Sequence, residues 1–156
     1  MKAKLFIGLV ICTMLLSVSN LKSEPESVFF IYEDNSGYYG ILNANGEVLI
    51  PCKYDEIKPF SENLARVELD DKYGFIDSRG KEIVPCKYGD VSELSEGLVA
   101  VELDFKWGFI DSRGNEVIPC KYDYAKDFSE GLAAVGLDDK WGFIDSEGKE
   151  VIPYKY

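Results

Sequence analysis

The sequence predicts an all-β fold, a tandem array of four three-stranded antiparallel units with a 34-residue period. Three observations support this: a turn glycine recurs at that interval, an aromatic-Gly pair recurs with it, and apolar residues alternate in between. The glycines are Gly46, Gly80, Gly114 and Gly148, and the pairs are Tyr39-Gly40, Tyr73-Gly74, Trp107-Gly108 and Trp141-Gly142. Because such self-similarity is the signature of repeat architectures, it decides the fold class.

The chain begins with a segment typical of a secretory signal peptide. Met1-Lys2-Ala3-Lys4 is basic, residues 5–18 are mostly apolar, and Ser17-Val18-Ser19 has the small-x-small pattern of a cleavage site. The apolar run is shorter than the roughly 20 residues that span a membrane. We therefore expect residues 1–19 to be removed and residues 20–27 to form a short linker. The β domain, residues 28–156, is then periplasmic or extracellular; an uncleaved membrane anchor is the alternative.

The expected mature chain is strongly acidic. Removal of residues 1–19 takes away Lys2 and Lys4 but no acidic residue, which leaves 15 Lys and Arg against 28 Asp and Glu, a net charge of −13. Such a chain repels phosphate backbones. We therefore expect no nucleic-acid partner.

Each unit is expected to contain three strands, which are described for the second unit. Residues 64–69 alternate with a period of two and predict the first strand. Residues 73–77 predict the second, and residues 81–84 the third, which ends at Pro85 because proline cannot donate to a ladder. The turn glycine suits a type I turn that is closed by a left-handed residue. About a dozen residues of loop or single helical turn then lead to the next unit.

The array is expected to start and end in phase with the repeat. Residues 28–33 read as a degenerate first strand, which gives twelve strands in units of about residues 28–62, 63–96, 97–130 and 131–156. No unit can bury its apolar face alone, so neighbouring units must pack together. An open twisted array is favoured over a closed propeller- or barrel-like ring, because closure needs a specific number of repeats.

A long motif recurs from unit to unit. Its fullest copy runs Trp-Gly-Phe-Ile-Asp-Ser-x-Gly-x-Glu-Val-Ile-Pro from Trp107, then Lys-Tyr, then Phe-Ser-Glu-Gly-Leu-Ala from Phe128. The pattern resembles the WG repeat family of bacterial proteins over about residues 28–156. Tyr39 and Tyr73 depart from it by standing where the family has Trp. The resemblance implies a repeat architecture, and it implies no particular activity.

The residue types argue against an enzyme. The chain has no histidine, so it lacks the usual group for acid–base and triad chemistry at neutral pH. Its many carboxylates leave a glycosidase-like pair open, but they recur in every unit, as turn residues do. These recurring acids are Asp77, Asp111 and Asp145 together with Glu62, Glu96 and Glu130. We expect no cofactor and no specific metal site.

Aromatic side chains form two recurring columns. The repeat-marker aromatics, Tyr39, Tyr73, Trp107 and Trp141, are expected to pack between repeats, with a platform of exposed rings as the alternative. The second column follows each proline and is expected in the loops, where packing in the core is favoured and a ligand-facing position is the alternative. Its members are Tyr54, Tyr88, Tyr122 and Tyr156.

Three cysteines follow the prolines at the same period: Cys52, Cys86 and Cys120. An odd number leaves at least one thiol unpaired within the chain. Because free cysteine often packs as a small hydrophobe, we expect three buried apolar side chains.

These observations favour an exported, non-enzymatic interaction module that binds a protein along an extended surface. Binding of a carbohydrate or of the cell wall through the repeated aromatics is the alternative. Exposed rings would favour that alternative.

Overall fold

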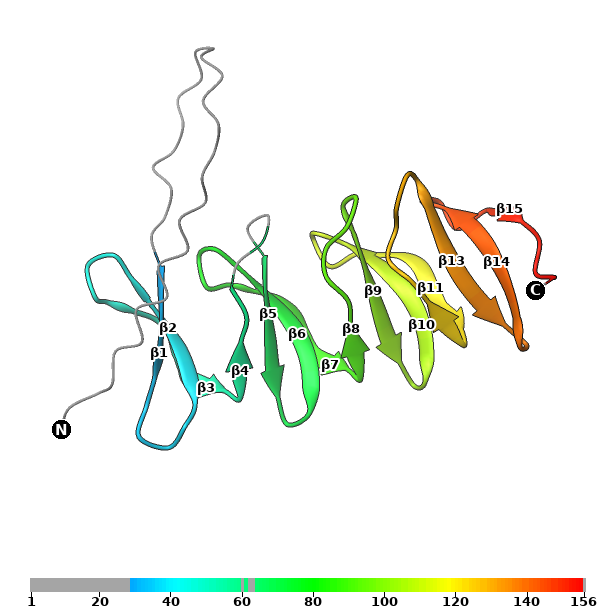
Figure 1. Ribbon diagram of the computed structural model, residues 1–156. Coiled ribbons are helices and arrows are strands. Elements are labelled where there is room, and N and C mark those ends of the chain that lie inside the picture. The colour runs from blue at the N-terminus through cyan, green and yellow to red at the C-terminus, as the bar shows by residue number, and fades with distance from the viewer. Residues whose placement is uncertain (1–28, 60, 62–63, 156) are drawn as a thin grey trace, which may run out of the picture.

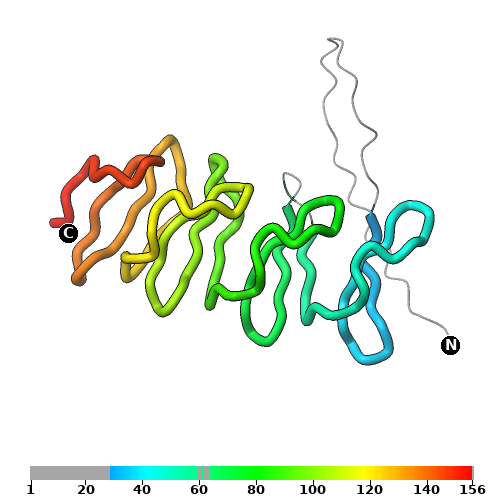
Figure 2. The backbone as a smooth tube through the Cα atoms, turned by 180° about the vertical axis from the view of Figure 1, so that it is seen from behind, coloured from blue at the N-terminus to red at the C-terminus, as the bar shows by residue number. Residues whose placement is uncertain are grey.

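The computed structural model describes residues 29–59, 61 and 64–155. These residues contain fifteen β-strands and no helix. The strands form four small sheets that follow one another along an elongated, twisted array, and the ends of the array lie far apart (Figure 1). The view from behind shows the same open arrangement (Figure 2). The prediction of an open all-β array is therefore confirmed.

Each sheet is an antiparallel meander of strands that are consecutive in sequence. The first sheet contains β1 (Phe29–Glu33), β2 (Tyr39–Asn43) and β3 (Val48–Tyr54). The second contains β4 (Glu56–Ile57), β5 (Leu64–Leu69), β6 (Lys72–Asp77) and β7 (Glu82–Tyr88). The third contains β8 (Asp90–Val91), β9 (Leu98–Leu103), β10 (Lys106–Asp111) and β11 (Glu116–Tyr122). The fourth contains β12 (Tyr124–Ala125), β13 (Leu132–Leu137), β14 (Lys140–Asp145) and β15 (Glu150–Ile152).

Three of the sheets have a fourth strand that the sequence did not predict. The two-residue strands β4, β8 and β12 pair with the strand that follows them, in the stretch expected to be loop or helical turn. The chain therefore passes from one sheet to the next near residues 55, 89 and 123, earlier than the unit boundaries expected near 62, 96 and 130. A two-residue strand is too short to show alternation, which is why the pattern missed it.

The third strand does not stop at its proline, as the sequence predicted, but continues to the tyrosine that follows. In the third sheet Trp107 pairs with Tyr122 and Phe109 pairs with Ile118, so residues 119–121 bulge opposite Gly108. A bulge tolerates proline because the residues in it leave the regular ladder. The same shift in register occurs in the first two sheets.

The turn glycines close the hairpins β2–β3, β6–β7, β10–β11 and β14–β15. Their φ angles lie between 78° and 81°, the left-handed region that the predicted turn requires. In the second sheet the Gly80 amide donates to the Asp77 carbonyl at 2.9 Å, and Asp77 Oδ1 accepts from the backbone amides of Arg79 and Lys81. Asp111 and Asp145 repeat this arrangement. The prediction that these acids are turn residues is confirmed.

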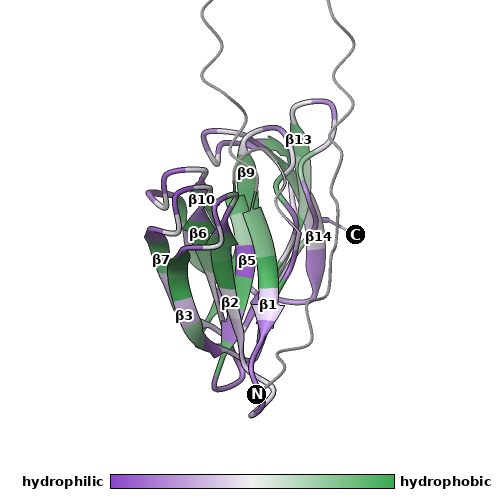
Figure 3. Ribbon diagram, turned by 90° about the vertical axis from the view of Figure 1, so that its left-hand side faces the viewer, coloured by the Kyte–Doolittle hydropathy of each residue, from purple (hydrophilic) through white to green (hydrophobic). Residues whose placement is uncertain are grey.

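The sheets pack face to face. One face of each sheet, here called its forward face, points toward the next sheet in sequence. In the second sheet it carries Phe75, Val84 and Tyr88, which form one cluster with Val99 and Ile110 of the third sheet. Equivalent clusters join the first sheet to the second and the third to the fourth. Viewed along the array, apolar residues gather in the strands and polar residues in the turns (Figure 3).

The predicted signal peptide, residues 1–19, and the predicted linker, residues 20–27, lie outside the described residues. Within the described part of the chain, no helix has the length and apolar character needed to cross a membrane.

Candidate binding surfaces

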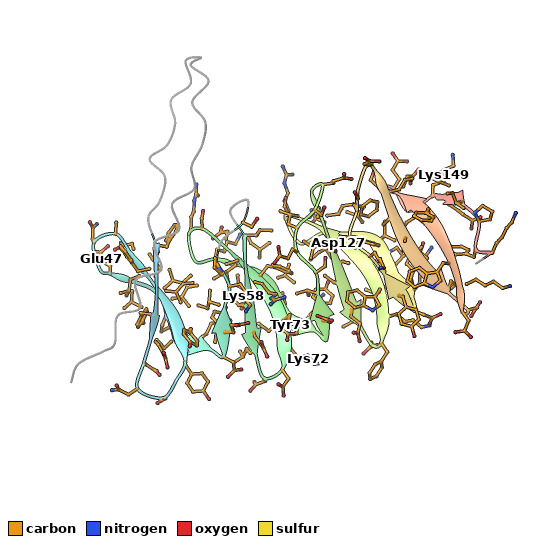
Figure 4. All side chains as sticks on the ribbon, viewed as in Figure 1. Glu47, Lys58, Lys72, Tyr73, Asp127 and Lys149 are labelled. Carbon is orange, nitrogen blue, oxygen red and sulfur yellow. The ribbon has the colours of Figure 1, made fainter. Side chains whose placement is uncertain are left out.

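The repeat-marker aromatics lie between core and surface. Tyr39, Tyr73 and Trp107 are half-buried against the clusters between sheets, whereas Trp141 is 36% exposed. Tyr73 lies beside Lys72 near one end of β6 (Figure 4), and the Arg66 guanidinium lies 5.3 Å from the centre of its ring. In the first three sheets the column therefore contributes to packing, and only its last member is available at the surface.

The second aromatic column lies in strands, so its predicted place in the loops is wrong. Its rings are buried, which agrees with packing in the core and contradicts the ligand-facing alternative. These tyrosines are the last residues of β3, β7 and β11. Tyr54 is 1% exposed, Tyr88 5% and Tyr122 0%. The ammonium group of the preceding lysine lies over each ring, at 4.6 to 5.0 Å from its centre. The strand continues past the proline, and this carries each ring into the space between two sheets. Tyr156, the fourth member, lies outside the described residues.

The three predicted cysteines are free and half-buried. Each thiol points to a backbone carbonyl of β1, β5 or β9 in its own sheet, for example Cys120 Sγ to Val101 O at 3.7 Å. Burial is the main cause that raises the pKa of Cys86 and Cys120, so these thiols are poorly reactive at neutral pH. The structure places them as small packing groups rather than as redox centres, although they are less buried than predicted.

The recurring carboxylates are used in local structure. Burial raises the pKa of Asp111, but hydrogen bonds from Asn115 and Arg113 outweigh it and hold that pKa below its ordinary value. Glu96 and Glu130 occupy left-handed turn positions, and Glu96 Oε2 accepts from the Gly131 amide at 2.9 Å, which ties the third sheet to the fourth. Glu62 lies outside the described residues. Among the described residues no cluster of three or more potential ligands could hold a metal ion.

One long edge of the array, here called the tip edge, is lined by the hairpins β1–β2, β5–β6, β9–β10 and β13–β14 (Figure 1). Three of these hairpins are two-residue turns with positive φ at both central residues, as in a type I′ turn. The central pairs are Asp70-Asp71, Asp104-Phe105 and Asp138-Asp139. Aspartate tolerates this conformation better than most residues, so most of the edge is acidic.

Two of these turns are held by an aspartate from the start of the same sheet. Asp123 Oδ2 accepts from the Asp138 amide at 2.9 Å, and Asp55 Oδ2 accepts from the Asp70 amide at 2.8 Å. The Lys106 ammonium also pairs with Asp123 and lowers its pKa below the ordinary value. The third sheet has Gly89 at the equivalent position and so lacks a side chain for the same bond to Asp104.

Phe105 breaks the acidic pattern of the tip edge. Its side chain is 88% exposed, and its φ of 62° lies in the left-handed region. The equivalent residues in the neighbouring sheets are Asp71 and Asp139. An aromatic ring therefore projects from the middle of an acidic edge.

The face of the fourth sheet that is equivalent to the forward faces of the other three sheets is exposed and apolar. We call it the end face, and it comprises Tyr124, Gly136, Trp141, Phe143 and Ile152. Tyr124 is 57% exposed, and its ring stacks on Trp141 with the two ring centres 5.9 Å apart and the planes 21° apart. Phe143 and Ile152 are 37% and 38% exposed, although their equivalents in the other sheets are at most 5% exposed.

Sequence reasoning did not single out Phe105, Tyr124 or Gly136. The signal was present as departure from the repeat. Asp-Asp-Lys becomes Asp-Phe-Lys at Phe105, while Tyr124 and Gly136 stand where the second and third sheets carry acids. These three positions do not follow the 34-residue repeat, so the recurring pattern did not indicate them.

The chain was compared with known families, proteins and structures. A family model described as WG containing repeat matches residues 39–73, 73–106, 107–141 and 141–156. No curated protein matches the chain.

Among solved structures, the chain is similar to "KlHsv2 with loop 6CD replaced by a Gly-Ser linker", with 11% identity and a TM-score of 0.47. That similarity covers 78% of this chain and 46% of the other, so this chain matches less than half of that protein's length. The family matches run without a gap from residue 39 to residue 156, and the chain therefore belongs to the WG containing repeat family.

Proposed function

We propose that the chain is an exported, non-enzymatic interaction module that binds a partner protein along its tip edge. The observation that carries this proposal is Phe105, whose ring is 88% exposed on a backbone in the left-handed region. Both features have a free-energy cost in the isolated chain. A residue that maintains such a cost points to a role in contact with another molecule.

The surroundings of Phe105 favour a particular kind of partner. The neighbouring hairpin tips carry Asp70, Asp71, Asp138 and Asp139, and Asp104 precedes Phe105 itself. Aromatic residues are enriched among the side chains that dominate interface energies, and complementary charge steers association. The matching surface is an apolar pocket for the ring with basic residues around it.

A non-enzymatic role is supported by the residue types and their positions. The chain has no histidine. Asp77, Asp111 and Asp145 accept hydrogen bonds from turn amides, and Asp123 is paired with Lys106. Hydrogen bonds hold the pKa of Asp111 and that of Asp123 below the ordinary value, so both carboxyl groups stay ionised at neutral pH and are poor proton donors.

Export is supported by the first nineteen residues alone, with their basic start, apolar run and small residues. Mass spectrometry of the protein recovered from its producing cells tests it. A mature N-terminus near Asn20 is expected, and a chain that retains residues 1–19 contradicts cleavage.

Position-specific photo-crosslinking tests the protein-binding role. A benzophenone amino acid is placed at position 105 in one variant, and at position 71 or position 139 in two control variants with the same type of turn. Irradiation of the producing cells is expected to give one discrete adduct from position 105, much weaker from the controls. Phe105→Asp without a crosslinker should bind the purified adduct partner at least about tenfold more weakly than the unmodified chain. Equal adducts from all three positions, or none, contradict the proposal.

A carbohydrate ligand is the second candidate. Tyr54, Tyr88 and Tyr122 are buried, so the repeated loop aromatics do not support it. Among the residues that the structure describes, exposed stacked rings support it at the Tyr124–Trp141 pair of the end face alone.

A further inference from the structure

The end face differs from the equivalent faces of the other sheets along one row of residues. Strand pairing places Tyr124, Gly136 and Trp141 in register across β12, β13 and β14, so their side chains share one face. The corresponding rows are Glu56, Glu68 and Tyr73 in the second sheet and Asp90, Glu102 and Trp107 in the third. In the fourth sheet the two acids that precede the marker aromatic in this row are thus replaced by a tyrosine and a glycine.

The two replacements act together. A Cβ atom at position 136 would lie 3.1 Å from Tyr124 Cδ2 and 3.3 Å from Tyr124 Cβ, so a side chain there would crowd the tyrosine. Gly136 therefore lets Tyr124 lie across β13 and reach Trp141, on which it stacks. Glutamate at this position, as in the second and third sheets, would obstruct the ring and add a charge beside it.

The replacements also run against solubility. Relative to the second and third sheets, the fourth sheet has lost two charges from this face and gained an exposed ring. Contiguous exposed apolar patches mark binding sites, whereas single exposed apolar side chains are common on any surface.

We propose that the Tyr124–Trp141 pair is a binding site for uncharged or N-acetylated hexopyranose chains. This inference rests on the second candidate function and names its ligand class. One face of a pyranose ring is lined by C–H groups and stacks on an aromatic ring, while the hydroxyl groups at its edge stay hydrated. Two preformed, nearly parallel rings offer such contacts without ordering new side chains, so little entropy is lost on binding.

Charge selects among glycans. The β13–β14 turn directly beside Trp141 contains Asp138 and Asp139, and the chain carries a net charge of −11. Like charges across an interface suppress association. Uronic acids and sulfated sugars are therefore excluded, and hydroxyl or N-acetyl groups are accepted.

The experiment uses the chain from residue 20 to residue 156 with Trp107→Tyr, the residue found at the equivalent position 73, so that Trp141 is the only fluorophore of its type. The probes are chitohexaose and cellohexaose, with an oligogalacturonate as the charged control. Either neutral hexasaccharide is expected to shift Trp141 emission saturably and to protect it from iodide quenching. The oligogalacturonate should do neither.

Two variants restore residues of the third sheet and so have a precedent in the same fold. Tyr124→Asp and Gly136→Glu should each weaken binding at least about tenfold while leaving the thermal melt close to that of the parent. Phe105→Asp is the matched control, because it removes an exposed ring from the tip edge and should leave glycan binding unchanged.

Three results would overturn the assignment. The first is no saturable response to either neutral hexasaccharide at millimolar concentration. The second is equal binding of the charged control. The third is sedimentation that shows the chain self-associating through this face, with Gly136→Glu restoring the monomer; the face would then bind a second copy. Failure here leaves the crosslinking at position 105 unaffected, so the two proposals are tested separately.

Discussion

Gly108 on β10 lies so close to the neighbouring strand β11 that a Cβ atom there would stand 2.5 Å from the carbonyl oxygen of Ile118. It would also stand 2.6 Å from the amide nitrogen of Cys120. A Cβ atom at Gly40, Gly74 or Gly142 would likewise stand 2.5 to 2.7 Å from the equivalent carbonyl oxygen. The glycine of the aromatic-Gly pair is thus required by the bulge at the proline, which brings a neighbouring backbone against it.

Gly108→Val should therefore destabilise the chain strongly. The obstacle is the backbone of β11 from Ile118 to Cys120, so the new side chain can be accommodated only by displacing that strand. We expect a loss of about 2 kcal/mol or more in the free energy of unfolding, measured by denaturant titration.

Glu102→Gln is the control for Gly108→Val, because it changes a charged side chain on the neighbouring strand β9 and leaves all backbone contacts in place. It should stay within about 0.5 kcal/mol of the parent. Equal unfolding midpoints for the two variants would contradict the packing argument.

Gly89→Asp should stabilise the chain. A Cβ atom at position 89 meets nothing closer than 3.4 Å, so the side chain fits. The new carboxylate can accept from the Asp104 amide, as Asp123 does from Asp138, and Lys72 Nζ lies 3.9 Å from that Cβ position. We expect a gain of about 0.5 to 1.5 kcal/mol, seen as a higher melting temperature.

The reciprocal variant, Asp123→Gly, should lower the melting temperature by a similar amount. If Gly89→Asp instead lowers it, repulsion from Glu102, whose Oε1 lies 3.4 Å from that Cβ position, outweighs the new bonds.

The pairing of Asp123 with Lys106 should make stability depend on acid pH. The hydrogen bond from Lys106 is the main cause that holds the Asp123 pKa below its ordinary value of 3.8. The ionised form therefore stabilises the folded chain above that value, and the contribution disappears as pH falls through the lower folded pKa. Asp123→Asn should melt a few degrees below the parent at pH 7 and together with it near pH 2.

Salt offers an independent check on this pair. At 1 M NaCl the Debye length falls to about 3 Å, so the difference between Asp123→Asn and the parent at pH 7 should narrow. A difference that stays constant with both pH and salt would show that the carboxylate charge is not involved.

Phe105→Asp should leave folding intact even though it removes the proposed protein contact. Aspartate occupies the equivalent left-handed positions 71 and 139. We expect the free energy of unfolding to stay the same or to rise by at most about 1 kcal/mol. A clear fall in the free energy of unfolding would mean that the Phe105 ring packs within the chain, and the protein-binding proposal would lose its support.

Recurrence explains which parts of the fold could be predicted. Gly80 and Asp77 mark a turn by local backbone chemistry, and the alternation in residues 64–69 marks a strand, so both are legible in sequence. The strand beyond Pro85 was missed because proline ordinarily ends pairing, and only the bulge opposite Gly74 makes it compatible with the ladder. Tyr88 was consequently expected in a loop, although it lies in the core.

The sequence by itself determined the all-β class, the 34-residue period and the turns, because each follows from local backbone preferences repeated along the chain. It favoured the open array without deciding it, since closure depends on how neighbouring sheets pack. Tertiary structure alone decided which rings are exposed. Tyr122 and Trp141 look alike as repeated aromatics, yet one is sealed between two sheets and the other lies on the end face. Burial depends on what the next sheet covers, and a local pattern does not contain that information.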